Sequence, residues 1–185
     1  MSLAHFNFPT SIDFGLGAIK TLSSVLSNKG VKNPCVVTDK SIAELGFLKS
    51  ILQDLTGFGI TPHLYAATEG NPLASYVNRG VEHYKARRCD SVVAIGGGAA
   101  LDVAKAISLL ATNPGTLYDY EDFREKSLSA INPLPFTVAV PTTAGRGSEV
   151  GRSSVISDDE TKQKKIIFDP QMLPDHVIAD PELSF

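Results

Sequence analysis

The chain has 185 residues, a formal net charge of −3 at pH 7 and a pI of about 5.8. With 43% hydrophobic and 20% charged residues it is apolar enough to bury a core, which excludes an intrinsically disordered protein. The slightly acidic balance also excludes general binding to nucleic acids or acidic membranes, since both need an excess of lysine and arginine.

Cysteine content and the first residues predict a cytoplasmic protein. The chain has two cysteines, Cys35 and Cys89, which are too few for a disulfide framework and suit a reducing compartment. Residues 1–15 lack the charged and apolar segments of a secretory signal. No apolar run approaches the roughly 20 residues that a membrane span needs.

Alternating strands and helices are predicted in the first part of the chain. A strand at about residues 6–13 and a short amphipathic helix over 16–26 precede the apolar, β-branched strand 34–39. Apolar residues three or four positions apart predict a helix over 42–55, and residues 60–66 are the next strand candidate.

The same alternation continues through the middle of the chain. Asn71 and Pro72 suit the N-cap and first position of a helix with an apolar stripe over 73–84. The uninterrupted apolar run 91–95 predicts a strand buried on both faces, and residues 99–111 form the predicted helix after it.

Two more strands and a hairpin are predicted toward the end. Residues 137–140 and 176–180 are strand candidates, and 153–157 with 165–168 suit a hairpin. Strands that alternate with helices of about 10–15 residues are typical of a mostly parallel α/β sheet.

Three consecutive glycines lie between a predicted buried strand and a helix in the sequence GGGAALD (96–102). Glycine lets a backbone approach a ligand closely, and a helix N-terminus offers free N–H groups and partial positive charge to a phosphate. A tight turn without a ligand is the alternative. Neither the G-x-G-x-x-G fingerprint nor the Walker pattern is present.

Asp39 ends the predicted strand 34–39, at the edge where open α/β sheets bind ligands. Its carboxylate can accept hydrogen bonds from a ribose diol and would repel a 2′-phosphate. It can equally cap the helix predicted from residue 42, and the spacing favours that cap.

Two further segments carry groups that suit an anionic ligand. The loop PTTAGRGSE (141–149) offers hydroxyls, glycines and a cation, Arg146, although such loops are also common without a ligand. Lys164 and Lys165 precede an apolar run. Such pairs usually lie in solvent at a strand edge, where their charge prevents pairing with another strand. A single lysine that points at a phosphate is the alternative.

No metal site or nucleophile is assembled locally in the sequence. The histidines, which are His5, His63, His83 and His176, have no H-x-x-x-H or H-E-x-x-H spacing. The G-x-S-x-G motif of serine hydrolases is also absent. We expect each histidine to be a surface residue or a hydrogen-bonded structural one.

Together these segments resemble the N-terminal cofactor domain of the iron-containing (group III) alcohol dehydrogenases, which have the dehydroquinate-synthase-like fold. The motifs that carry the resemblance are AIGGGAALDVAKAI (94–107), VAVPTTAGRGSEV (138–150), the lysine before FDPQMLP (168–174) and VIADPEL (177–183). The resemblance implies a Rossmann-like dinucleotide-binding domain over 1–180. Residues 181–185 would open a linker to a helical metal-binding domain that is absent from this chain.

The resemblance also implies a set of NAD-binding residues. Asp39 would hold the adenosine ribose and favour NAD over NADP, the segment 97–102 would hold the diphosphate, and Thr142 and Thr143 would contact the adenine end. The complete set is Asp39, Asn71, Gly97, Gly98, Ala99, Asp102, Thr142, Thr143, Gly151 and Lys164.

Three positions depart from the family pattern, which usually has Ser at 99 and Thr at 146 and 151. Ala99 and Gly151 each lack a hydroxyl whose hydrogen bond would contribute about 0.5–1.5 kcal/mol. Arg146 replaces a hydroxyl with a cation. We hypothesise that it faces an anion, either on an acidic substrate or on a 2′-phosphate.

The implied activity is NAD-dependent and metal-dependent alcohol dehydrogenation of a small-molecule alcohol or aldehyde. One Asp and three His of the helical domain would hold Fe²⁺ or Zn²⁺, which would act as Lewis acid on the alcohol or carbonyl oxygen. No catalytic or metal-ligating residue is therefore expected in this chain. By itself the chain is expected to bind NAD weakly without turnover. A homodimer formed through residues 5–13 is also implied.

Other functions remain open from the sequence. The same fold is found in glycerol and glycerol-phosphate dehydrogenases and in dehydroquinate-synthase-like enzymes, although the PTTAGRGSE segment favours the alcohol dehydrogenases. A non-catalytic nucleotide-binding module is the non-enzymatic alternative.

Overall fold

Six strands form the central sheet of the computed structural model, which describes residues 8–123 and 127–184. Their order across the sheet is β1-β8-β5-β4-β2-β3, and every neighbouring pair is parallel. The strands are β1 (Ser11–Phe14), β2 (Pro34–Asp39), β3 (His63–Thr68), β4 (Ser91–Gly96), β5 (Phe136–Pro141) and β8 (His176–Ala179). This sheet confirms the predicted α/β class.

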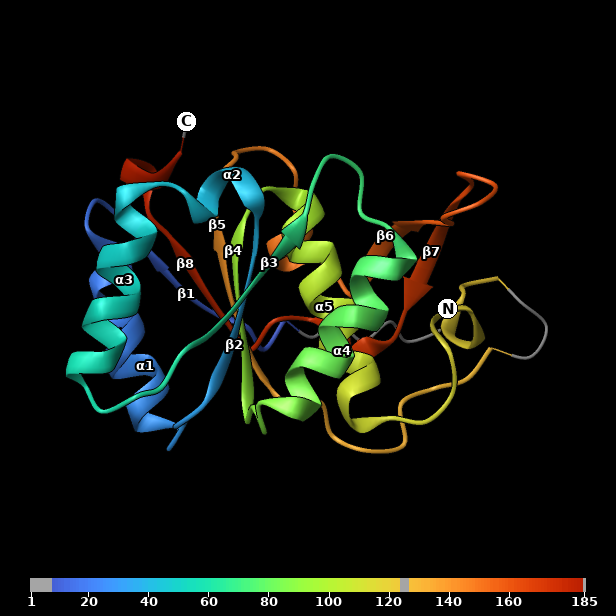
Figure 1. Cartoon of the computed structure of the whole chain (residues 1–185), viewed down its shortest axis with the longest axis horizontal. Coiled ribbons are helices and arrows are strands. Elements are labelled where there is room, and N and C mark those ends of the chain that lie inside the picture. Colours follow the sequence, from blue (N-terminus) through green and yellow to red (C-terminus); the bar gives the residue numbers. More distant parts are fainter. Residues whose placement is uncertain (1–7, 124–126, 185) are drawn as a thin grey trace, which may run out of the picture.

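Helices cover both faces of the sheet (Figure 1). The α-helices are α1 (Leu22–Asn28), α2 (Lys40–Ala43), α3 (Gly46–Gly57), α4 (Ala74–Ala86) and α5 (Gly98–Thr112). The 3-10 helices are η1 (Ala18–Thr21), η2 (Leu117–Tyr120), η3 (Ser148–Val150), η4 (Pro170–Met172) and η5 (Pro181–Leu183).

Alternating residues of β4 separate two apolar clusters. Val93 and Ile95 pack with α1 and α3 on one face of the sheet. Val92 and Ala94 pack with α4 and α5 on the other face. Because successive side chains of a strand point to opposite faces, a continuous apolar run in the sequence produces a strand buried on both sides.

A two-stranded hairpin lies outside the main sheet, as predicted (Figure 1). Its antiparallel strands are β6 (Ser153–Ser157) and β7 (Lys164–Phe168). Ile156 and Ile167 are fully buried and join the cluster that contains α4 and α5. The hairpin is therefore anchored to the α5 side of the sheet.

The apolar stripe over 42–55 belongs to two helices, so the single helix predicted there is wrong. α2 ends at Ala43, and Leu45 is extended (φ −78°, ψ 144°) as the N-cap of α3. Ile42 and Leu48 are buried, whereas Leu45 is 38% exposed. The spacing of apolar residues shows which side chains can be buried together. It does not show where the backbone leaves the helical conformation between them.

The N-cap predicted at Asn71 is also wrong. The N-cap of α4 is Leu73, which has no capping side chain. A residue of the hairpin turn replaces it, because Asp159 accepts hydrogen bonds from the amide of Ser75 at 2.8 Å and from its hydroxyl at 2.5 Å. A cap from a distant segment cannot be read from the residues next to the helix.

Two strand boundaries also differ from the prediction. β1 runs over Ser11–Phe14 instead of about 6–13, of which residues 6 and 7 lie outside the described residues. β3 begins at His63 and ends at Thr68, two to three residues later than predicted.

In the part of the chain that the structure describes, no helix is long and apolar enough to cross a membrane.

Residues 181–183, where a linker was expected to begin, pack against the domain as η5. Leu183 is buried in the same apolar cluster as α1 and α3. Just before η5, Asp180 accepts hydrogen bonds at 3.1 Å from the amides of Gly17 and Ile19. The start of η1 and the end of β8 are thereby joined.

We predict that Gly80→Ala destabilises the protein, although alanine favours helices. A β-carbon at Gly80 of α4 would lie 2.2 Å from Cδ1 and 2.8 Å from Cγ1 of Ile107 in α5. Forcing these helices apart is expected to lower the free energy of unfolding in urea by about 1–3 kcal/mol.

Gly57→Ala in α3 is the matched control, because a β-carbon there would meet nothing within 4 Å. This change is expected to raise the free energy of unfolding by about 0.5–1 kcal/mol. Equal effects of the two substitutions would contradict the close approach of α4 and α5.

Candidate functional site

The carboxyl ends of β2 and β4 lie side by side, although the chain leaves these strands toward opposite faces of the sheet. After β2 it enters α2 and α3 on one face, and after β4 it enters α5 on the other (Figure 1). Such a topological switch point opens a crevice beyond the strand ends, where α/β proteins bind ligands.

Two cavities meet at this crevice. The switch-point cavity, of about 500 Å³, is lined by Asp39, Lys40, Ser41, Glu44, Thr68, Glu69, Gly70, Gly97, Ala99 and Ala100. The hairpin cavity, of about 510 Å³, is lined by Gly70, Asn71, Pro72, Gly97, Gly98, Ala99, Asp102, Thr143, Arg146, Ser148, Val155, Ser157 and Lys164. Gly70, Gly97 and Ala99 line both, so the start of α5 and the segment after β3 border the two cavities.

Asp39 caps α2 and also lines the switch-point cavity. Its Oδ1 accepts hydrogen bonds from the amide of Ile42 at 2.8 Å and from the hydroxyl of Ser41 at 2.6 Å, which confirms the cap interpretation. Its Oδ2 has no hydrogen bond to a described residue and lies 3.3 Å from the place of a β-carbon at Gly96. The second oxygen is therefore available to a ligand.

Thr68 adds a buried hydroxyl at the same cavity. This last residue of β3 is fully buried, and its Oγ1 has no hydrogen-bond partner among the described residues. A buried hydroxyl without a partner costs free energy. Thr68 belongs to the cavity lining, but its hydroxyl oxygen has no surface open to solvent.

The turn from β4 into α5 requires glycine at Gly96. Its φ is 152°, and a β-carbon there would lie 2.8 Å from Cβ of Ala100. The chain enters α5 through Gly97, and no side chain caps the helix. Because the first amides of a helix have no partner within it, they remain free to bind an anion.

Segment 70–72 and the hairpin form the far wall of the hairpin cavity. The amide of Ser157 donates a hydrogen bond to the carbonyl of Pro72 at 2.7 Å. Asn71, one of the residues implied by the family resemblance, is exposed on this segment and lines the cavity. Asn71, which does not cap α4 as predicted, thus lies at the candidate site.

Asp102 and Lys105 hold the loop after β5 and the hairpin against α5. Lys105 is only 2% exposed, lies 3.2 Å from Oδ1 of Asp102, and donates to the carbonyls of Ser148 at 2.9 Å and of Ser153. Asp102 in turn accepts from the hydroxyl of Ser148 at 2.6 Å and from the amide of Val155 at 3.1 Å. Both carboxylate oxygens are thus engaged, although Asp102 borders the cavity.

The ionisation of Lys105 reflects this environment. Burial lowers the pKa of Lys105, and the charge and hydrogen bond of Asp102 partly offset the shift. An ammonium group has three donors, which suit the carbonyl and carboxylate oxygens around it.

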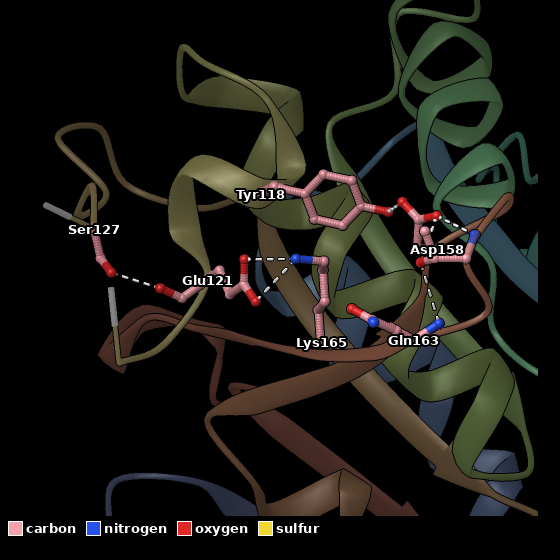
Figure 2. A network of polar contacts seen from close by, with 7 residues as sticks. Tyr118, Glu121, Ser127, Asp158, Gln163 and Lys165 are labelled. Atoms are coloured by element: carbon pink, nitrogen blue, oxygen red, sulfur yellow. Dashed lines mark hydrogen bonds and ion pairs between the residues drawn. The ribbon is translucent and has the colours of Figure 1, made fainter. Parts of the chain in front are cut away.

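Lys164 and Lys165 have different surroundings, which separates the two alternatives posed by the sequence. Nζ of Lys165 lies 3.0 Å from the carboxylate of Glu121 and 5.1 Å from the ring centroid of Tyr118 (Figure 2). The hydroxyl of Tyr118 in turn donates a hydrogen bond to Asp158. Lys164 is exposed, lines the hairpin cavity and has no side-chain partner among the described residues. Of the two, Lys164 is the one that a ligand can reach.

The remaining residues of the predicted set lie in the loop after β5. Thr143 lines the hairpin cavity, and its hydroxyl is 3.3 Å from the place of a β-carbon at Gly97. Thr142 is buried outside both cavity linings, and its amide donates to the last carbonyl of β4 at 3.0 Å. Gly151 is also outside both linings, with its carbonyl 3.5 Å from Nζ of Lys105.

A metal ion does not fit the described residues. Within 8–123 and 127–184, no three His, Cys, Asp or Glu side chains converge to hold one. No chemical step is therefore assigned to a metal ion bound by these residues.

Two buried polar residues at the site, Lys105 and Thr68, were not predicted from the sequence. A lone lysine in the buried, largely apolar helix α5 was a usable signal, because a fully buried lysine is rare unless it is paired. Thr68 carried no such signal, because its burial and its missing partner depend on how the end of β3 packs.

Comparison with known proteins matches nearly the whole chain. The family model described as iron-containing alcohol dehydrogenase matches residues 9–181. Alcohol dehydrogenase 4 of Schizosaccharomyces pombe is 37% identical over 185 residues, which are 100% of this chain and 43% of that protein.

Solved structures show the same likeness. A 1,3-propanediol oxidoreductase superposes with a TM-score of 0.89 at 36% identity, over 98% of this chain and 47% of its own. Sulfoacetaldehyde reductase from Bifidobacterium kashiwanohense, in complex with NAD⁺, gives a TM-score of 0.90 at 27% identity, over 100% of this chain and 48% of its own. The chain spans about half the length of the proteins it matches.

We predict that Lys105→Met strongly destabilises the protein. The change leaves Asp102 without its counter-charge and removes the donor for the carbonyls of Ser148 and Ser153. Removing one partner of a buried ion pair costs about 3–5 kcal/mol, which urea unfolding at pH 7 would measure. Lys49→Met, at an exposed position of α3, is the control with little expected change. A loss at Lys105 as small as at Lys49 would contradict the role of Lys105.

Proposed function

The chain belongs to the iron-containing alcohol dehydrogenase family, and on this premise we propose that it binds NAD across the two cavities. In the complete enzyme this cofactor would exchange a hydride with a primary alcohol or aldehyde. The observation that carries the proposal is the uncapped start of α5 between the cavities, with the free carboxylate oxygen of Asp39 beside the glycine turn that leads into this helix.

The two cavities suit different parts of a dinucleotide. The first amides of α5, at Gly98 and Ala99, would bind the diphosphate, and Lys164 would add a positive charge from the hairpin. Asp39 Oδ2 would accept hydrogen bonds from the adenosine ribose.

The charges of the switch-point cavity favour NAD over NADP. Three carboxylates, Asp39, Glu44 and Glu69, line it beside one cation, Lys40, and Lys40 is paired with Glu69. A 2′-phosphate placed against this negative surface would be repelled, whereas a neutral ribose diol would be accepted.

In the reaction this chain would bind and orient the cofactor. The bound nicotinamide supplies the hydride chemistry. The start of α5 would fix the diphosphate, and the hairpin and segment 70–72 would limit how the nicotinamide half can lie. The metal ion of the family, Fe²⁺ or Zn²⁺, would be held by residues other than the described ones, so these residues alone are expected to bind NAD without turnover.

We also propose a cytoplasmic homodimer. β1 is an edge strand, and it exposes Ile12 (49%) and Phe14 (79%), apolar side chains that pairing with a second copy would cover. Cys35 and Cys89 are both free and buried, which suits a reducing compartment.

We predict that calorimetric titration detects NAD⁺ binding that is at least about tenfold tighter than NADP⁺ binding. Asp39→Asn keeps an acceptor that can cap α2 but removes the charge. It is expected to weaken NAD⁺ binding and to narrow the preference over NADP⁺ by about tenfold. Asp54→Asn, an exposed position on α3, controls for net charge. An unchanged preference in Asp39→Asn would contradict the ribose assignment, and absence of NAD⁺ binding by the unmodified chain would contradict the proposal as a whole.

A further inference from the structure

Arg146 lies directly beside the start of α5. Its Cβ and Cγ are 3.6 and 3.7 Å from the place of a β-carbon at Gly98, the first residue of the helix. Arg146 lines the hairpin cavity and is exposed, and it makes no hydrogen bond or ion pair with a described residue. The guanidinium is therefore unengaged at the edge of the cavity.

The hairpin cavity has an excess of positive charge. Arg146 and Lys164 line it without side-chain partners among the described residues, and the N-terminus of α5 adds a partial positive charge. The carboxylate in the lining, Asp102, is already bound by Lys105 and Ser148. The cavity thus suits a ligand with more than one negative charge.

We infer that Arg146 binds the diphosphate of the dinucleotide, in the cavity that the hairpin lysine Lys164 also lines. This inference rests on the proposed NAD site and adds a residue to it. The planar guanidinium can donate two hydrogen bonds to one phosphate, which a threonine or lysine at this position cannot do in the same geometry.

The position of Arg146 favours the diphosphate over the other two anions considered for it. A 2′-phosphate would lie next to Asp39, which lines the switch-point cavity, whereas Arg146 lines the hairpin cavity. An acidic substrate would have to meet the nicotinamide ring. The stem of Arg146 instead lies against Gly98, whose amide is among those expected to hold the diphosphate.

The test is calorimetric titration of the chain with ADP and with adenosine, which share the nucleoside and differ in the diphosphate. Arg146→Gln is expected to weaken ADP binding about tenfold and to leave adenosine binding unchanged. Its ADP affinity should also depend less on salt concentration. Arg87→Gln removes the same charge at the C-terminal end of α4, just before β4 begins. This control is expected to change neither affinity.

Further titrations separate the alternatives. Equal ADP affinities of Arg146→Gln and the unmodified chain would overturn the inference while leaving the NAD proposal intact, and failure of the unmodified chain to bind NAD⁺ or ADP would overturn both. A loss restricted to NADP⁺ would place Arg146 at a 2′-phosphate. That result would overturn the diphosphate assignment.

Discussion

The candidate site depends on the interactions of one buried group, the ammonium of Lys105. A charge removed from water is tolerated only where fixed acceptors replace its hydration, and here these are the Asp102 carboxylate and the carbonyls of Ser148 and Ser153. Those acceptors belong to α5, to the loop after β5 and to the start of β6. Satisfying one charge therefore brings together three segments that border the hairpin cavity.

The two cavities differ in charge because different strands supply their walls. The end of β2, the C-cap of α2 and the segment after β3 contribute the carboxylates Asp39, Glu44 and Glu69 to one cavity. The loop after β5 and the hairpin contribute the cations Arg146 and Lys164 to the other. A dinucleotide has a matching asymmetry, with a neutral ribose diol a short distance from a charged diphosphate. The switch point places both surfaces on either side of the α5 N-terminus.

Features set by neighbouring residues were predicted closely from the sequence. The apolar runs 34–39, 91–95 and 137–140 became β2, β4 and β5, each within about one residue at either end. The three glycines became the turn into α5, because a β-carbon at Gly96 would collide with the next turn of the chain. The family resemblance named Asn71 and Lys164, and both line the hairpin cavity.

The sequence by itself determined the α/β class, the central strands and the glycine turn, since each depends on apolar periodicity or backbone freedom within a few residues. Tertiary structure alone decided which group completes each local motif. Asp159 caps α4 by binding Ser75, which lies 84 positions away in the sequence. Lys105 donates to carbonyls that are 43 and 48 positions away. Glu121 binds Lys165 from 44 positions away, whereas the neighbouring Lys164 lines the cavity. Such pairings depend on how the hairpin packs against α5, and no spacing in the sequence records that packing.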